Sequence, residues 1–302
     1  MSRPLRIEFT LVDLLAVIAV VVLLLALLIP STTGPLERHD QVICQNHLNE
    51  IGTACAMFEN SKGYYPPECS NTQVNPIKVP WPALLVNQLG RGDLDGLSKQ
   101  DGGSWSGYME VFTCPSNPVA GRNPTTSTPL HYAANVGRKN VSGTVTMPSD
   151  WKENGVFMPQ IKGQPFEKVS SSFVNSHDGL KYTLLVMETV CSADWGLPYV
   201  DDSNYGVYWT STDGTNPPTD PKAINDPTIL KTPRAKNRCL ISSRHPGGAN
   251  VVFCGGNTQW LSDNISADVI DLLMTPDGQD VKEAGTVTPL PKQRPLLETM
   301  LQ

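Results

Sequence analysis

Seven cysteines and a small set of acids and histidines are the side chains of this chain best suited to chemistry. The cysteines are Cys44, Cys55, Cys69, Cys114, Cys191, Cys239 and Cys254. No two of them show C-x-x-C spacing, so the pattern predicts no structural zinc site. Their number is odd, which means that at least one thiol is free or pairs between chains. Cys44 and Cys55 would lie roughly 16 Å apart along one helix, so they cannot bond each other.

Neither of the cysteines in distinctive sequence contexts has the setting of a nucleophile. A reactive thiolate is usually stabilised by a helix N-terminus or by a cationic neighbour. Cys114 stands directly before Pro115 and Cys254 at a turn, and neither context supplies such a group. The chain also contains no G-x-S-x-G, P-loop or HExxH motif. We therefore expect no enzyme and assign no catalytic residue.

His245 and the acids after residue 200 are the remaining candidates for binding. His245 precedes Pro-Gly-Gly, so we interpret it as a histidine that bonds backbone and orders a loop; a metal or ligand site is the alternative. Asp201, Asp202 and Asp213 lie in a polar, proline-rich segment, 201–236, that we expect to be a long surface loop. Oxygen ligands there suit calcium, but the spacing matches no EF-hand loop. We predict no metal site and no cofactor, with calcium as the alternative.

The elements that position these side chains can be predicted from periodicity. Leu48, Ile51, Cys55 and Phe58 recur at three- and four-residue spacing and predict a helix with one apolar stripe. That helix ends near Gly63, and the prolines and glycine at residues 30–35 should kink or break its beginning. Residues 81–89 predict a short helix, and residues 64–180 are otherwise expected to form loops and short strands.

Further along the chain the apolar pattern changes to that of strands. Residues 182–188 predict a buried strand. Two apolar runs, 250–254 and 257–261, flank Gly255-Gly256 and predict a hairpin with a two-residue turn. Asp263 or Ser266 would cap a following helix that ends at Met274. The last twenty residues are rich in proline and predict a flexible tail.

Residues 9–29 form an apolar run whose only ionisable side chain is Asp13. As a helix, this run would measure roughly 31 Å, which matches the core of a bilayer. The run is long for a secretory signal peptide, so a plain signal anchor and a prepilin-type leader are the better readings. Arg3 and Arg6 precede it, and by the positive-inside rule they keep the N-terminus in the cytoplasm. The net charge of −6 predicts no nucleic-acid partner.

The stretch from Glu8 to Leu15 (EFTLVDLL) resembles the prepilin-type cleavage and methylation segment. The resemblance implies cleavage before Phe9 and an acid at Asp13 that pairs with a neighbouring subunit's freed amine. That family cuts after glycine and carries glutamate as its acid, whereas this chain has Glu8 and Asp13. We therefore expect the leader to remain uncut.

The body resembles the bacterial family named for an H-x9-DG motif, a prepilin-type processing-associated domain of unknown function. The resemblance is carried by the blocks Cys44-Gln-Asn-His-Leu-Asn-Glu-Ile-Gly52, Cys114-Pro-Ser116, His131-Tyr-Ala-Ala-Asn135, Asn154-Gly-Val-Phe157, Asp178 to Glu188 and His245 to Gly256. Gly255 stands where the family has aspartate, and Gly256 keeps the glycine. We assign His245, Gly255 and Gly256 structural roles. The resemblance implies pseudopilin-like topology and export-related assembly.

Together these features predict an α+β protein with a pilin-like N-terminal helix packed on a small antiparallel sheet with long loops. Its expected divisions are a cytoplasmic leader-like segment (1–8), a transmembrane helix (9–29), a helical stalk (31–62), a globular domain (63–282) and a flexible tail (283–302). We expect a non-enzymatic, single-pass inner-membrane protein with its C-terminal domain outside the cytoplasm. Its partners would be the bilayer and, through the N-terminal helix and Asp13, copies of itself or other pilin-like subunits. A membrane-tethered module that binds a ligand through 201–236 is the alternative.

Overall fold

The computed structural model describes residues 10–28, 30–71, 78–95, 107–117, 129–138, 147–190, 194–199, 205–209, 224–231 and 240–295. Glu8, Phe9, Asp201, Asp202 and Asp213, singled out from the sequence, lie outside these ranges. The elements within them combine helices and strands, as the predicted α+β class requires. Besides those introduced below, they are α3 (Trp81–Leu84), α4 (Gly92–Asp95), α5 (Ser171–Ser176), α6 (Pro227–Lys231), and the two-stranded ladder of β1 (Cys69–Ser70) and β2 (Val79–Pro80).

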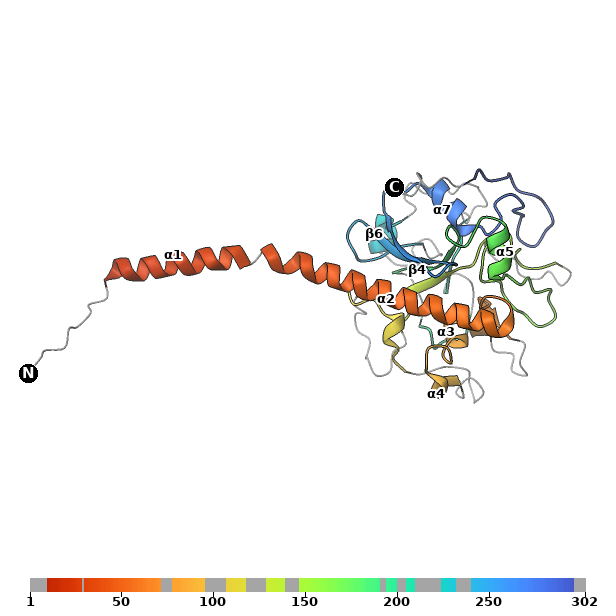
Figure 1. The fold of residues 1–302 in the computed structure, drawn as a ribbon, viewed down its shortest axis with the longest axis horizontal. Helices are drawn as coiled ribbons and strands as arrows, with labels where there is room; N and C mark the ends of the chain where they lie inside the picture. The colour runs from red at the N-terminus through yellow and green to blue at the C-terminus, as the bar shows by residue number, and fades with distance from the viewer. Residues whose placement is uncertain are drawn as a thin grey trace, which may run out of the picture.

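Two consecutive helices, α1 (Leu11–Leu28) and α2 (Pro30–Lys62), extend from one side of the body (Figure 1). We expected Pro30, Gly34 and Pro35 to kink or break the junction with the membrane span. The helical elements do divide there, since α1 ends at Leu28 and α2 begins at Pro30, but α2 continues through Gly34 and Pro35. Proline suits the start of a helix, because the N–H that it lacks would be unpaired there. Pro35 is the sixth residue of α2, beyond the four whose N–H groups lack helical partners, so it removes one backbone hydrogen bond near that end.

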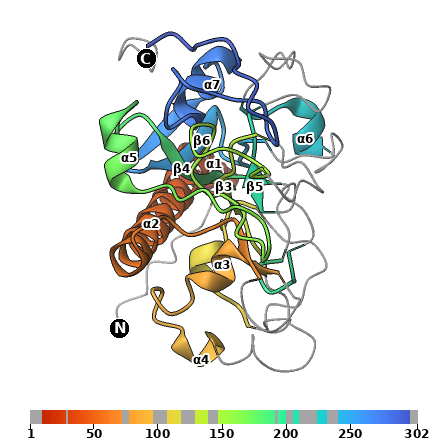
Figure 2. The ribbon, with the colours of Figure 1, turned by 90° about the vertical axis from the view of Figure 1, so that its right-hand side faces the viewer.

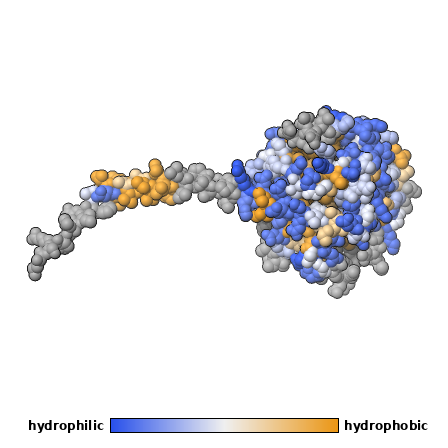
Figure 3. Space-filling view, viewed as in Figure 1, coloured by the Kyte–Doolittle hydropathy of each residue, from blue (hydrophilic) through white to orange (hydrophobic). Residues whose placement is uncertain are grey.

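The large apolar side chains of α1 are exposed from Leu11 to Leu25. Their exposed fractions range from 47% at Val21 to 75% at Leu11. Figure 3 shows this hydrophobic helix well away from the largely hydrophilic surface of the body. Among the described residues, no helix combines the length and hydropathy of a membrane span. The span predicted from the sequence also included Phe9 and Ile29, which are not described.

A five-stranded sheet with the order β5-β3-β4-β6-β7 organises the body. Its strands are β3 (Tyr132–Asn135), β4 (Leu184–Glu188), β5 (Gly206–Val207), β6 (Gly248–Phe253) and β7 (Thr258–Ser262). The strand predicted at 182–188 is confirmed, and all five of its β4 residues are buried. We predicted an antiparallel sheet, and every pair is antiparallel except β3 with β5, which is parallel.

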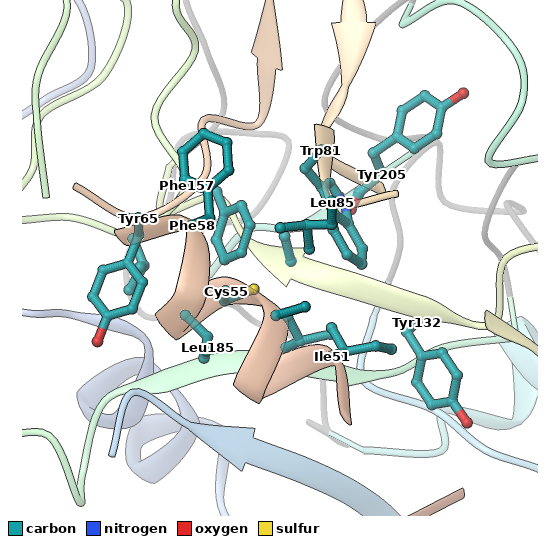
Figure 4. Packing of buried hydrophobic residues seen from close by; sticks show 14 of the residues in the cluster. Ile51, Cys55, Phe58, Tyr65, Trp81, Leu85, Tyr132, Phe157, Leu185 and Tyr205 are labelled. Carbon is teal, nitrogen blue, oxygen red and sulfur yellow. The ribbon is translucent and has the colours of Figure 1, made fainter. Parts of the chain in front are cut away.

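Helices cover both faces of this sheet, as the end-on view in Figure 2 shows. The predicted α2 stripe of Leu48, Ile51, Cys55 and Phe58 is buried in the larger core cluster, part of which Figure 4 shows. On the opposite face, α7 (Ala267–Met274) packs on side chains of β4 and β6 in a second cluster. A Cβ atom on Gly52 would lie 2.9 Å from Val252 Cγ2, so glycine permits the close approach of α2 to β6.

The β6–β7 hairpin is confirmed, but its turn differs from the prediction. Gly256 N donates to Phe253 O at 2.8 Å and Phe253 N donates to Asn257 O at 3.0 Å, which encloses three residues rather than two. Only the last of them, Gly256, has a positive φ, +82°. A three-residue loop with glycine in the left-handed region is a common hairpin connection. A Cβ on Gly255 would approach the carbonyl oxygen of Leu180 to 3.3 Å.

Two segments predicted to lie loosely on the surface pack against the body where they are described. Tyr205, Tyr208 and Trp209 are buried around β5, so this part of 201–236 is not a surface loop. Each buried aromatic side chain removes a large apolar area from water. These three side chains therefore favour packing against the body, although the residues around them in the sequence are polar. In the C-terminal segment, Leu290 N donates to Val281 O at 2.9 Å and Gln293 N donates to Gly278 O at 2.8 Å. Residues 283–295 therefore contact the body rather than trail from it.

Candidate functional site

Four chemically reactive side chains meet where α2 crosses the sheet: Cys44, Cys114, Glu188 and His245. One sulfur, nitrogen or oxygen atom from each lies within 4.8 Å of those of the other three. The four residues are 0%, 5%, 1% and 2% exposed, respectively. The cluster is thus a buried meeting point of two thiols, an imidazole and a carboxylate.

Each member comes from a different segment. Cys44 lies on α2, one helical turn before Leu48 of the buried stripe, and therefore faces the sheet. Cys114 follows the short helix η2 (Glu110–Phe112), and its backbone N–H donates to His131 Nδ1 at 2.8 Å. Glu188 is the last residue of β4, and His245 lies in the loop that leads into β6. The antiparallel pairing of β4 with β6 brings the last two together.

The imidazole of His245 contacts three of the surrounding polar groups. Its Nδ1 lies 2.7 Å from Glu37 Oε1. Glu37 belongs to α2, and its side chain is half-buried. Its Nε2 lies 3.3 Å from Glu188 Oε1 and 3.5 Å from Cys114 Sγ. The ring of Trp260 on β7 packs edge-on at 6.3 Å between centroids. These contacts surround the His245 ring and fix its orientation.

The loop that carries His245 is ordered by its neighbours. Ser243 Oγ accepts from His245 N at 3.1 Å and donates to Gly248 O at 2.6 Å. Asn225, from the segment before α6, accepts from Ser243 N at 2.7 Å and donates to Gly248 O at 2.9 Å. We expected the His245 ring itself to bond backbone and order this loop. Ser243 and Asn225 do so instead, which leaves the ring to face the acids and the thiol.

The carboxylate of Glu188 is only half satisfied by hydrogen bonds. Its Oε2 accepts from Asn250 N on β6 at 2.6 Å. Its Oε1 is buried and has no hydrogen-bond partner; His245 Nε2 is its charged neighbour at 3.3 Å. A buried carboxylate oxygen without a donor is costly. Glu188 Oε1 therefore has free acceptor capacity that points into the cluster.

The pKa values of the cluster are strongly interdependent. The hydrogen bond with the Cys44 thiol and that with His245 lower the pKa of Cys114 to about 6, against the opposing effect of burial. The same thiol–thiol hydrogen bond, together with burial and the charge of Glu188, raises the pKa of Cys44. Burial would lower the pKa of His245, but the hydrogen bond with Cys114, the charge of the Glu188 carboxylate and the hydrogen bond with Glu37 raise it to about 11. Without a bound ion, the arrangement is a Cys114 thiolate paired with a His245 imidazolium.

Asp13 lies far along the chain from this cluster and has a local role. Its Oδ2 accepts from Thr10 Oγ1 at 2.6 Å and from Thr10 N at 3.0 Å, while Asp13 N lies 3.3 Å from Thr10 Oγ1. Reciprocal bonds between the N-cap residue, which precedes the first helical residue, and the residue three positions on form a capping box. Asp13 thus caps the start of α1 in the isolated chain.

Reasoning from the sequence assigned no role to Cys44, Cys114 or Glu188, because it searched for ligands at short spacing. The cluster draws one residue from each of four widely separated segments, which no spacing pattern reports. One signal could have found it: these four residues fall in four different blocks of the motif resemblance, those beginning at Cys44, Cys114, Asp178 and His245.

The comparisons with known proteins agree with that resemblance at the level of the family. The model of a family described as a protein of unknown function (DUF1559) matches residues 41–268, about three quarters of the chain. The match includes all four cluster residues and leaves out α1 and the predicted prepilin-type segment. No curated protein and no solved structure matches the chain. With its sheet, most of α2 and the whole cysteine, histidine and glutamate cluster inside the matched range, the chain belongs to the DUF1559 family of unknown function.

Proposed function

We propose that this chain is a non-enzymatic, pilin-like, single-pass membrane protein with a structural or assembly role. The observation that carries the proposal is the exposed apolar surface of α1, an 18-residue helix in which Asp13 is the only ionisable side chain. Soluble monomers rarely expose apolar patches larger than a few hundred Å². A helix that is apolar on every side is normally surrounded by lipid or by other protein. We assign the bilayer as its surroundings.

The dimensions and polarity of the segment support this assignment. At 1.5 Å per residue α1 is about 27 Å long, and the predicted span adds Phe9 and Thr10 before it and Ile29 after it. Asp13 lies in the first turn, where its carboxylate is bonded to Thr10. An acid near the membrane interface costs much less than one at the midplane.

The short connection between α1 and the body supports a membrane tether that also fixes the position of the body relative to α1. α2 follows after a single residue, and its second half is buried in the core of the body. Arg3 and Arg6 place the N-terminus in the cytoplasm by the positive-inside rule, so the body would lie outside the inner membrane. Through the same helix the chain would pack with copies of itself or with other pilin-like subunits. With Glu8 before Phe9, the leader would remain uncut.

The proposal predicts that charges in the middle of α1 release the protein from membranes. Val20→Lys combined with Leu24→Lys should move most of the full chain from the carbonate-resistant membrane fraction to the soluble fraction. Each lysine near the centre of a span costs about 3 kcal/mol on insertion scales. Fractionation of bacterial membranes followed by immunoblotting measures the result.

The chain offers a matched control for this experiment. Val42 and Met57 are equally exposed apolar residues, each 51% exposed, but they lie on α2. Val42→Lys combined with Met57→Lys should leave the chain in the membrane fraction. Recovery of the unsubstituted chain in the soluble fraction would overturn the proposal. The intact mass of the extracted protein then decides between an uncut chain and one that begins at Phe9.

No described observation favours the alternative of a ligand-binding module. Most of the segment that would carry the ligand, 201–236, lies outside the described residues. Its described parts are buried around β5, bond to the loop of His245 through Asn225, or form α6.

A further inference from the structure

We propose that Cys44, Cys114, Glu188 and His245 bind one divalent transition-metal ion, with Zn²⁺ the best match to their chemistry. Two thiols, one imidazole and one carboxylate supply four donor atoms from four segments, all within 4.8 Å of one another. Zn²⁺ prefers four sulfur, nitrogen and oxygen ligands in a tetrahedron, whereas calcium and magnesium prefer oxygen alone. Thiolates further favour zinc over the hard cations.

The distances within the cluster are those between neighbouring corners of such a site. Bonds of about 2.0–2.3 Å to zinc place tetrahedral ligand atoms about 3.3–3.8 Å apart. His245 Nε2 lies 3.3 Å from Glu188 Oε1 and 3.5 Å from Cys114 Sγ. Cys44 Sγ would complete the set after a small side-chain adjustment, since all the ligand atoms are already within 4.8 Å.

The surroundings of the ligands point independently to a bound cation. Metal-binding histidines usually give their second ring nitrogen to a carboxylate, which fixes the tautomer and the ring orientation. Glu37 Oε1 holds His245 Nδ1 in this way at 2.7 Å, which leaves Nε2 directed at the cluster. Likewise Asn250 N holds Glu188 Oε2 at 2.6 Å, and the other oxygen, Oε1, is buried without a hydrogen-bond partner. In each side chain, one polar atom is held by a neighbouring residue, and the other polar atom is available to bind a metal ion.

Charge balance leads to the same conclusion. Two thiolates and a carboxylate around a divalent ion leave a net charge of about −1, and His245 stays neutral. Without the ion, the buried Glu188 Oε1 has no hydrogen-bond partner, which is costly. A metal ion replaces the protons of the thiols and of the imidazole and supplies bonds to all four residues.

The geometry favours a structural site over two other uses of the same residues. The order Cys114, His245, Glu37 is that of a nucleophile, its base and an orienting acid. However, Cys114 is only 5% exposed, which leaves a substrate little access to its sulfur. A Cys44–Cys114 disulfide is the second use, and it would remove two of the four ligands.

A metal here would join the parts of the fold that carry the proposed tether. Cys44 and Glu37 lie on α2, and Glu188 ends the central strand β4. Cys114 and His245 bring in the η2 loop and the loop before β6. One ion would thus fasten the stalk helix to the sheet and to two loops. This inference does not depend on the surroundings of α1 and can be tested separately.

Cobalt titration of the full chain tests the site. The chain is purified under reducing conditions, stripped of metal and titrated with Co²⁺ alone. We expect one Co²⁺ per chain, the intense visible bands of tetrahedral cobalt and a near-ultraviolet thiolate-to-cobalt charge-transfer band, all removed by Zn²⁺. Cys44→Ala and Cys114→Ala should each lose about half of the charge-transfer intensity. Cys55→Ala, a buried cysteine on the same helix, should keep all of it.

A second variant keeps the proposal testable if loss of a ligand prevents folding. Glu37 is not a ligand and its side chain is 37% exposed, so Glu37→Gln should fold normally by circular dichroism. Loss of a carboxylate that orients a metal-binding histidine typically weakens metal affinity about 10- to 100-fold, and we expect a loss in that range. Cobalt without a charge-transfer band, unchanged affinity in Glu37→Gln, or a Cys44–Cys114 disulfide in the chain isolated without reductant would each overturn the proposal.

Discussion

Cys44 and Cys55 lie eleven residues apart on α2, and both are completely buried, yet their surroundings differ. Cys44 faces Cys114, Glu188 and His245. Cys55 lies in the apolar core within electrostatic reach of Cys254, and no histidine is among its neighbours in the described part of the chain. A cysteine that is buried among apolar side chains alone is a packing residue. A base and an acid that reach the thiol give it the setting of a ligand.

The electrostatics of the two sites follow from these neighbours. Burial raises the pKa of Cys55, with a smaller contribution from Cys254, so this thiol keeps its proton at any neutral pH. At the other site, the hydrogen bonds from Cys44 and His245 lower the pKa of Cys114 to about 6. The helix supplies the same residue type twice, and the loops that pack on it decide what each thiol can do.

The largest difference between Cys44 and Cys55 should appear in how much stability the protein loses when metal is removed. If zinc is present at 1,000 times its dissociation constant, its removal by EDTA should lower the free energy of unfolding by about 4 kcal/mol. Cys55→Ala should show the same loss on chelation, because its ligand set is intact. Cys44→Ala should show none. Urea unfolding of the full chain with and without EDTA measures the difference, and an equal loss in both variants would contradict the assignment.

The next largest effect should come from the imidazole that distinguishes the two sites. In the metal-free chain, His245→Gln leaves Glu188 and Cys114 without their buried cationic neighbour and should destabilise the fold by about 3 kcal/mol. His177 provides the comparison, since it lies 3.5 Å from Asp277 but its side chain is 35% exposed. His177→Gln should cost less than about 1 kcal/mol. Similar costs for the two variants would mean that His245 is only a packing residue.

The smallest effect concerns the pH dependence of the apolar site. The pKa of Cys55 is raised by burial from an ordinary value of 9.0, so above this pH the unfolded chain releases a proton that the folded chain retains. Stability from this thiol is therefore complete below about pH 9 and falls by about 1.4 kcal/mol per pH unit above it. Cys55→Ala should remove that part of the slope, whereas Thr53→Ala, on the exposed side of the helix, should not. Unfolding free energies between pH 8 and about 10.5 test this.

Local patterns in the sequence were sufficient for many of the elements. The three- and four-residue spacing of Leu48, Ile51, Cys55 and Phe58 predicted the buried side of α2, because one face of a helix packs on one sheet. The apolar run at 182–188 and the flanks of Gly255-Gly256 predicted β4 and the β6–β7 hairpin. The predicted length of the hairpin turn, two residues, was wrong. Loops of two and of three residues both use glycine at positions with positive φ, so the Gly255-Gly256 pair does not distinguish them.

The elements that the sequence did not predict depend on partners distant in the chain. β5 has only two residues, Gly206 and Val207, and is a strand because β3 lies beside it. Its flanking Tyr205 and Trp209 lie within a polar, proline-rich segment, so composition concealed their burial. Likewise, residues 283–295 contain prolines typical of a tail, but Val281 and Gly278 provide hydrogen-bond partners for their backbone.

The local order of this protein follows from its sequence: an apolar N-terminal helix with one acid, an amphipathic helix after it, and the strand and hairpin of the sheet. Each depends on residues within one or two turns or along one strand, so periodicity reports it. The meeting of Cys44, Cys114, Glu188 and His245 depends on the complete fold, because the strand order and the crossing of α2 bring together segments more than fifty residues apart. Ligand spacing in sequence carries no record of such a contact, and the chemistry of the cluster follows from the packing of the whole body.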